Sequence, residues 1–107
     1  MLNQRECDVL NILWKSEEPM MSTDIVNEMK DLTQSTVIAV LRKLLKENLV
    51  EVCGVTHSGK VLSRTYRPTE ESKDVLLNSF LELYGSFVNV VDPELMASKI
   101  LELKEKK

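Results

Sequence analysis

The side chains best suited to contact a polyanion gather in the middle third of the sequence. Residues 34–67 carry six Lys and Arg side chains and two Glu side chains, whereas the rest of the chain carries eight basic and fifteen acidic ones. The formal net charge of −3 therefore hides a local excess of +4. Lys and Arg neutralise phosphate, and Arg can also donate two parallel hydrogen bonds to guanine. This distribution suggests a nucleic-acid partner without deciding it.

A helix with one buried face is predicted where this charge is concentrated. In the stretch STVIAVLRKLLKENLVEVC, residues 35–53, apolar side chains recur at i, i+3, i+4, i+7 and i+8. The opposite face holds the candidate DNA contacts of this helix: Gln34, Ser35, Thr36, Ile38, Ala39, Arg42, Lys43 and Lys46. A basic helix face usually only contacts solvent, so a role in DNA binding has to be inferred from the elements around this helix.

Each of these residue types has a chemistry that suits duplex DNA. The amide, the hydroxyls and the free backbone N–H groups of the first helical turn, residues 34–36, can meet phosphates or base edges. Arg42 can pair with guanine or phosphate, and Lys43 and Lys46 suit phosphate. Ile38 and Ala39 could contact thymine methyl groups, or they could simply be apolar residues at the edge of the buried stripe.

Two short β-rich runs follow the helix and predict a hairpin. They are Leu49–Cys53 and Val61–Arg67, separated by GVTHSGK. His57, the only histidine, has no clear second ligand, so we interpret it as a solvated residue near the hairpin tip rather than a metal ligand. Lys60 suits phosphate because it lies near that tip, although Lys60 and Arg64 could equally be solvent-facing strand charges. All three are candidate DNA contacts.

Two capped helices are predicted to precede the basic helix. Asn3 and Glu6 have the spacing of a capping box for a helix within Leu2–Lys15. Ser22–Met29 forms a second, short helix capped by Ser22, and Thr33 caps the basic helix. The apolar residues expected in the core are Val9, Leu10, Leu13, Trp14, Ile25, Met29 and Leu32.

Two longer helices are predicted after the hairpin. The basic helix ends at Asn48, because Asn tolerates the left-handed backbone conformation better than most residues. Thr69 opens a fourth helix that runs to about Val91. Asp92 and Pro93 then form a cap followed by proline at the first helical position, which starts the last helix over Glu94–Lys106.

This order of elements predicts a mostly α fold with a small β-hairpin, which is a winged helix-turn-helix followed by a C-terminal helical dimerisation region. Helices one and two would hold the basic helix with its polar face outward, where it fits the major groove of DNA. We expect a winged-helix DNA-binding domain over residues 1–68 and a helical dimerisation region over residues 69–107.

The C-terminal helices carry more apolar side chains than one buried face requires. Two stripes, at 76, 80, 83, 84, 87 and at 77, 81, 88, 91, wrap around the fourth helix, and a third lies on the last helix. The predicted dimerisation residues are Leu76, Leu77, Phe80, Leu81, Leu83, Tyr84, Phe87, Val88, Val91, Met96, Ile100 and Leu103. We expect a homodimer, with a core inside a single chain as the alternative.

Several classes of protein are disfavoured by composition. No apolar run approaches the roughly 18–20 residues that span a bilayer, and charges interrupt the N-terminal segment where a signal peptide needs an apolar core. We therefore expect a cytoplasmic protein without membrane contact. Cys7 and Cys53 are isolated, which indicates free thiols and no metal site. We expect no cofactor and no enzyme, because no catalytic constellation is present.

The chain resembles the penicillinase-repressor family of bacterial transcriptional regulators. LNQRECDVLNILW, residues 2–14, resembles the family's L-T-x-x-E-x-x-V-M-x-x-L-W. STVIAVLRKLLKENLVEV is similar to its T-V-x-T-L-L-N-R-L-x-K-K-G-L-V, and Tyr66-Arg67-Pro68 is similar to its closing Y-x-P. The motifs cover residues 2–68, and the later helices match in arrangement only.

The resemblance implies a homodimeric repressor whose C-terminal helices form the dimer. It also implies release from DNA by metal exchange or by proteolysis, the latter requiring a signal-activated protease as a partner. Asn48 replaces a usual glycine, and Leu32 replaces an aromatic residue before the basic helix. The CxC motifs of the copper-responsive branch are absent, which argues against metal sensing.

The sequence as a whole therefore predicts a sequence-specific DNA-binding transcriptional regulator. We expect a homodimeric repressor that binds a palindromic double-stranded DNA operator through the helix at residues 34–48 and the hairpin. The alternative is a winged-helix module that binds protein instead of a specific DNA sequence, because most of the chain outside residues 34–67 is acidic.

Overall fold

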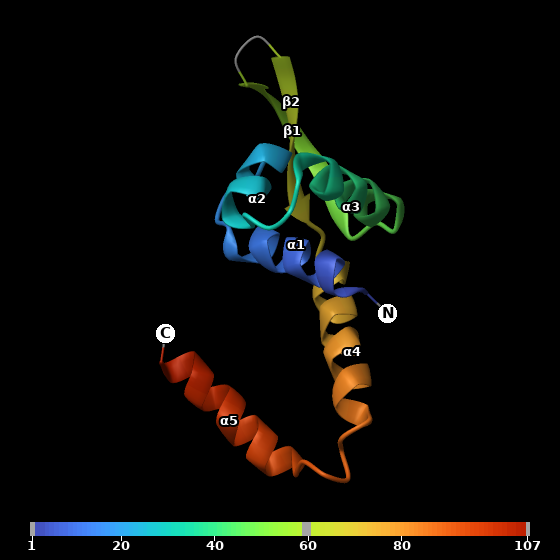
Figure 1. Ribbon diagram of the computed structural model, residues 1–107, viewed down its shortest axis with the longest axis vertical. Helices are drawn as coiled ribbons and strands as arrows, with labels where there is room; N and C mark the ends of the chain where they lie inside the picture. Colours follow the sequence, from blue (N-terminus) through green and yellow to red (C-terminus); the bar gives the residue numbers. More distant parts are fainter. Residues whose placement is uncertain (1, 59–60, 107) are drawn as a thin grey trace.

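Three helices, a hairpin and two further helices follow one another along the chain, as predicted (Figure 1). The computed structural model describes residues 2–58 and 61–106. The elements are α1 (Gln4–Lys15), α2 (Ser22–Glu28), α3 (Gln34–Lys46), β1 (Val50–Ser58), β2 (Val61–Pro68), α4 (Glu71–Gly85) and α5 (Pro93–Glu105).

The core lies where α1, α2 and α3 meet the base of the hairpin. Its buried apolar residues are Leu2, Val9, Leu10, Leu13, Ile25, Leu32, Val37, Leu41, Leu44, Leu49 and Val50. The predicted core positions of α1 and α2 are buried except Trp14 and Met29, which are half-buried at the edge of the core. Burial of this stripe gives the winged helix its stability and orients α3.

The helix caps follow the sequence prediction at three of the five starts. Asn3 and Glu6 form the predicted capping box, and Thr33 accepts a hydrogen bond from the backbone N–H of Thr36. The cap predicted for α2 is wrong, because Met21 is its N-cap and Ser22 is already helical. The carboxylate of Asp24 reaches back to the N–H of Met21, which leaves the Ser22 hydroxyl for another partner.

The end of α3 matches the prediction, but the hairpin is longer than predicted. Asn48 adopts the left-handed conformation, with φ of 61°. β1 extends to Ser58 rather than ending at Cys53, because the antiparallel ladder resumes after a register irregularity between Val52 and Gly54. Met20 adds one bridge to Tyr66, with N···O distances of 2.9 and 2.8 Å, and this bridge ties the α1–α2 connection to the hairpin.

The fourth helix is shorter than predicted. Glu70, not Thr69, is the N-cap of α4, and the helix ends at Gly85 rather than near Val91. Glycine and the β-branched residues that follow it are weak helix formers, and residues 86–90 form turns instead, followed by a bend at Val91. The Tyr84 hydroxyl donates to the backbone oxygen of Val91 at 2.9 Å, which closes this bend.

The last helix begins where predicted, and none of its described residues is buried. Asp92 caps α5 by accepting a hydrogen bond from the N–H of Leu95, and Pro93 occupies its first turn. α4 leads away from the winged helix on the side opposite the hairpin, and α5 turns back from the far end of α4, so that the two helices form a V (Figure 1). The radius of gyration is 16.0 Å, against about 13 Å for a compact chain of this length. In the part of the chain that the structure describes, no helix is long and apolar enough to cross a membrane.

Candidate nucleic-acid interface

The outer face of α3 is the most prominent candidate site. The helix is held by Val37, Leu41 and Leu44, which are buried against α1 and the hairpin. The opposite side of α3 therefore points outward, beside the hairpin that projects beyond it (Figure 1). Five of the predicted contact residues are exposed along this side without a side-chain partner in the hydrogen bonds or ion pairs described: Ser35, Ile38, Ala39, Arg42 and Lys46.

The first turn of α3 is partly occupied by contacts within the protein. Gln34 donates from Nε2 to the Ser22 hydroxyl at 2.6 Å, and this bond ties α3 to α2. Thr36 is half-buried, with its hydroxyl 2.9 Å from that of Thr33. Ser35 is the exposed member of this turn, so it is the one whose hydroxyl points to solvent.

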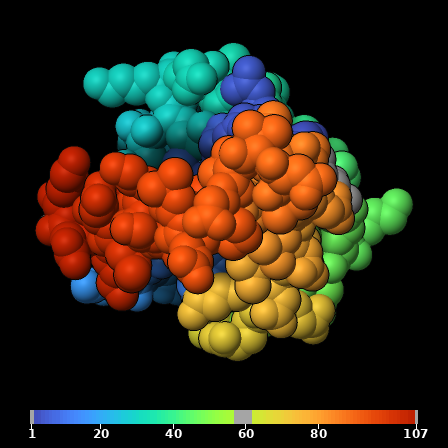
Figure 2. Space-filling view, turned by 90° about the horizontal axis from the view of Figure 1, so that it is seen from below, coloured from blue at the N-terminus to red at the C-terminus, as the bar shows by residue number. Residues whose placement is uncertain are grey.

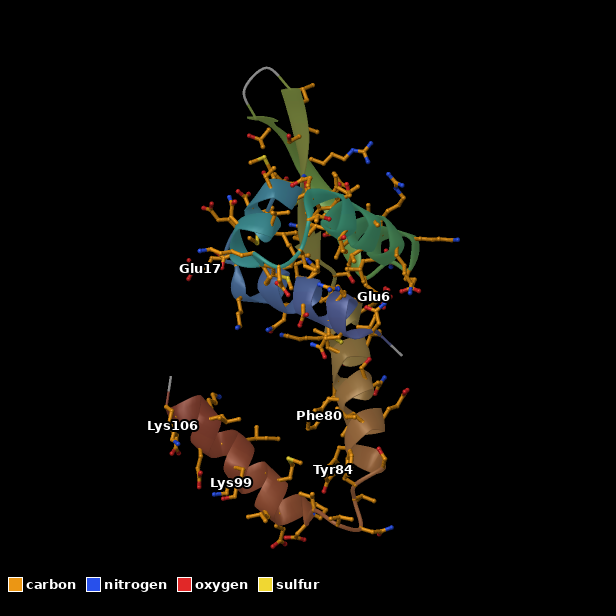
Figure 3. The ribbon with its side chains drawn as sticks, in the orientation of Figure 1. Glu6, Glu17, Phe80, Tyr84, Lys99 and Lys106 are labelled. Atoms are coloured by element: carbon orange, nitrogen blue, oxygen red, sulfur yellow. The ribbon has the colours of Figure 1, made fainter. Side chains whose placement is uncertain are left out.

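Lys43 is paired with a buried carboxylate, unlike the other basic residues of α3. Its Nζ lies 2.6 Å from Oε2 of Glu6, whose side chain is 2% exposed. The other oxygen, Oε1, accepts the N–H of Asn3 at 2.9 Å. Figure 3 labels Glu6 at the start of α1, next to α3. The pair therefore fastens the first turn of α1 to the last turn of the candidate reading helix.

The electrostatics of this pair favour its charged form. Burial raises the pKa of Glu6, but the hydrogen bonds from Lys43 and Asn3 outweigh burial and leave the pKa below its ordinary value. Glu6 in turn raises the pKa of Lys43. Sequence reasoning treated Glu6 as a cap and Lys43 as a phosphate contact, and no local pattern joins residues 37 positions apart.

The hairpin contributes one exposed predicted cation in the described chain, Arg64. Arg67 is ion-paired with Glu51 directly across the ladder, which raises the pKa of Arg67. The backbone of His57 pairs with Leu62, while its side chain, like the whole of Lys60, lies outside the described residues.

Neither cysteine takes part in a described site. Cys7 is half-buried and Cys53 exposed, both as free thiols. Burial, and then the nearby Asp8, raise the pKa of Cys7. In residues 2–58 and 61–106, no three His, Cys, Asp or Glu side chains gather as a metal site would require.

The predicted dimerisation residues lie on α4, on α5 and in the bend between them. Phe80 and Tyr84 project from α4 with rings 6.4 Å apart (Figure 3). A cavity of about 190 Å³ in the bend is lined by Phe80, Leu83, Tyr84, Phe87, Val91 and Met96. Leu76 differs from the rest, because it packs half-buried against the winged-helix core. Figure 2 looks onto the end of the molecule that α4 and α5 form.

A helix packed on two others, with its outer face exposed beside a hairpin, defines the winged-helix class of DNA-binding regulators. The chain belongs to the penicillinase repressor family, whose sequence profile matches residues 2–106. The match extends the resemblance, which rested on motifs in residues 2–68, through α4 and α5. The protein is therefore a transcriptional regulator that binds DNA.

Solved structures of other regulators share the fold. They include PadR of Bacillus subtilis in complex with operator DNA, RosR of H. salinarum and a variant of MepR from S. aureus. Their sequence identities are 19%, 18% and 17%, and their TM-scores are 0.63, 0.66 and 0.64. The alignment with PadR covers 97% of this chain and 71% of PadR. The alignment with RosR covers 98% of this chain and 94% of RosR, and that with MepR covers 98% of this chain and 76% of MepR. Comparison with curated protein sequences gave no significant match.

Proposed function

We propose that this protein is a homodimeric repressor that binds a palindromic operator and thereby blocks transcription. The winged helix, residues 1–68, reads one half-site, and residues 69–107 join two copies. α3 lies in the major groove, and the hairpin contacts the adjacent sugar-phosphate backbone. The protein recognises DNA without carrying out a catalytic step on it.

The proposal that this protein binds an operator rests on the exposed side of α3. Ser35, Ala39 and Arg42 follow one another along that side at helical spacing, and all three are exposed. Small side chains at 35 and 39 let a base edge approach the helix, and Arg42 can donate to guanine or to phosphate. Lys46 and Arg64 supply further exposed positive charge for phosphates.

The remaining polar residues predicted on α3 bond to other parts of the protein; they are Gln34, Thr36 and Lys43. Each is held by a neighbouring helix or cap in the absence of DNA. In the proposed complex they orient α3, and Ile38, which is 39% exposed, contributes an apolar contact at the edge of the groove. His57 and Lys60 remain proposed contacts of the hairpin tip.

The dimer part rests on apolar surface that the single chain leaves uncovered. Phe80 and Leu83 on α4 are 42% and 60% exposed, and Phe87 in the bend after α4 is 50% exposed. Ile100 and Leu103 on α5 are 44% and 64% exposed. An apolar patch of this extent is typical of a protein interface. A second copy related by a two-fold axis would cover it and would place two reading helices on a palindrome.

An electrophoretic mobility shift on the promoter region of the protein's own gene tests the proposal. A retarded complex that survives excess non-specific DNA and weakens steeply with salt is expected. A footprint over an inverted repeat would support the palindromic site. No retardation at low salt would overturn the proposal and favour a winged-helix module that binds protein.

A further inference from the structure

The start of α4 is bonded to two separate parts of the winged helix. The indole N–H of Trp14, at the end of α1, donates to the hydroxyl of Ser72 at 2.8 Å. Ser72 is fully buried, and its hydroxyl donates in turn to the backbone oxygen of Thr69 at 2.6 Å. Lys73 lies over the Trp14 ring, with Nζ 4.6 Å from the ring centroid.

The second attachment is the turn that ends the candidate reading helix. The backbone oxygen of Asn48 accepts a hydrogen bond from the Thr69 hydroxyl at 2.8 Å. The side-chain amide of Asn48 donates to Oε1 of Glu71 at 3.1 Å. The N–H of Thr69 also donates to the backbone oxygen of Leu49 at 3.0 Å. We call Trp14, Asn48, Thr69, Glu71 and Ser72 the α4 junction.

Asn48 does two things in this junction that a glycine could not do together. Its φ of 61° is readily adopted by glycine, so the turn alone does not require Asn. Only a side chain with a donor can bond to Glu71. The residue that ends α3 is therefore also the residue that holds α4.

The direction of α4 has a large effect on geometry because α4 acts as a lever. Its 15 residues span about 22 Å, so a tilt of about 10° at the junction moves the far end by about 4 Å. One base-pair step is about 3.4 Å along the duplex. A tilt of this size therefore shifts one end of α4 by about the rise of one base pair. An added base pair also rotates the half-site by about 35° around the duplex, so a changed spacer requires α4 to be displaced by at least this much.

We propose that the α4 junction makes this regulator selective for the spacing between its two half-sites. The inference rests on the proposed function, because spacing has meaning only for a dimer on paired half-sites. A site with the wrong spacing is bound only if α4 tilts, and tilting breaks the bonds of the junction. A site with the right spacing leaves those bonds intact.

Two substitutions should loosen the junction and leave the fold intact, because Asn48 and Glu71 are both exposed. Asn48→Gly keeps the left-handed turn and removes the donor, and Glu71→Ala removes the acceptor from the other side. Glu70→Ala is the matched control, because Glu70 is a neighbouring exposed acid and its side chain is not part of the junction. Trp14→Phe combined with Asn48→Gly loosens both parts of the junction and keeps an aromatic ring on Lys73. The bond from the N–H of Leu2 to the Ser79 hydroxyl, at 3.3 Å, and the packing of Leu76 on the core stay in place in every variant. Thermal melts of each variant report whether the fold is intact.

The probes are duplexes that the wild-type protein selects from a randomised pool, remade with the spacer changed by one and two base pairs. We expect all variants to bind the selected spacing as the wild type does. Asn48→Gly and Glu71→Ala should bind the altered spacings about threefold more tightly than the wild type, and the double variant about tenfold. Glu70→Ala should match the wild type on every probe.

The outcomes separate this inference from the proposed function. If the wild type selects paired half-sites and every variant keeps the wild-type spacing profile, the junction proposal is overturned and the proposed function stands. If the wild type selects no DNA, or selects single half-sites only, both are overturned. Equal loss of affinity on all probes would show that the junction supports stability or binding in general rather than spacing.

Discussion

At the scale of single residues, neighbouring Arg42 and Lys43 have different surroundings. Arg42 is exposed on the outer side of α3, whereas Lys43 is paired with the buried Glu6. Moving Lys43 to a phosphate would leave that carboxylate buried without a partner, which is strongly unfavourable. We therefore expect Lys43 to hold α3 and Arg42 to be the residue of the two that contacts DNA.

This difference predicts distinct effects of two matched substitutions. Arg42→Gln should reduce the slope of log affinity against log salt concentration by about one, because one phosphate contact is lost. Lys43→Gln should leave that slope unchanged and lower the melting temperature instead. Fluorescence anisotropy at four or more salt concentrations, with thermal melts, measures both. An equal fall in slope for the two variants would contradict the assignment.

The lowered pKa of Glu6 predicts how stability depends on pH. The unfolded chain binds the proton of this group more readily than the folded chain, so the stabilisation is complete above the ordinary pKa of 4.5 and is lost as the pH falls through the lower folded pKa. The melting temperature of the wild type should therefore exceed that of Glu6→Gln by a constant amount from pH 7 to about pH 5. Below that range the difference should shrink.

Exposed Glu17 provides the control for this pH dependence. Glu17→Gln should follow the wild type throughout the same series of melts. Parallel curves for the wild type and Glu6→Gln down to pH 3 would mean that the carboxylate of Glu6 contributes nothing through its charge.

At the scale of elements, the sequence predicts the features that depend on residue spacing and capping within one helix. The buried side of α3 follows from spacing, and the cap at Thr33 follows from residue type. The predicted end of α4 near Val91 is wrong because apolar residues continue through 87–91, although Gly85 and the valines after it are weak helix formers. The pairing of Lys43 with Glu6 depends on how α1 packs against α3, and no single-element pattern encodes that.

The cap of α3 gives a prediction at the element scale. Thr33→Ala removes the side-chain acceptor for the N–H of Thr36, which should cost about 1 kcal/mol of stability and lower the melting temperature by about 4–8 °C. Thr23→Ala, at an exposed position in α2, is the control and should change stability little. Urea denaturation of both variants measures the difference. Equal stability of the two would show that the cap adds nothing.

At the scale of the whole molecule, the winged helix is packed and the C-terminal helices are not. The described residues of α5 include no buried one, although its sequence carries a regular apolar stripe. Periodicity therefore predicts more apolar surface on α4 and α5 than the single chain buries. It could not predict that α4 ends at Gly85 and that the chain bends before α5, because that bend is closed by the hydrogen bond from Tyr84 to Val91.

The last prediction concerns this uncovered surface. Phe87→Ser combined with Leu103→Ser should convert a dimer of the 12.2 kDa chain into a monomer, because both side chains lie in the proposed interface and are at least half exposed in the single chain. Val90→Ser removes an even more exposed side chain outside the predicted stripes and should leave the dimer intact. Sedimentation velocity at micromolar concentration distinguishes the two masses.

The same variants connect the dimer to operator binding. In a dimer, binding of one winged helix raises the effective concentration of the second winged helix at the neighbouring half-site. A monomer loses this effect, so its affinity for paired half-sites should fall by about 10²- to 10⁴-fold, while its affinity for a single half-site stays the same. Val90→Ser should bind both probes as the wild type does. If Phe87→Ser with Leu103→Ser were monomeric and still bound paired half-sites with wild-type affinity, each winged helix would be reading DNA independently and dimerisation would have no part in recognition.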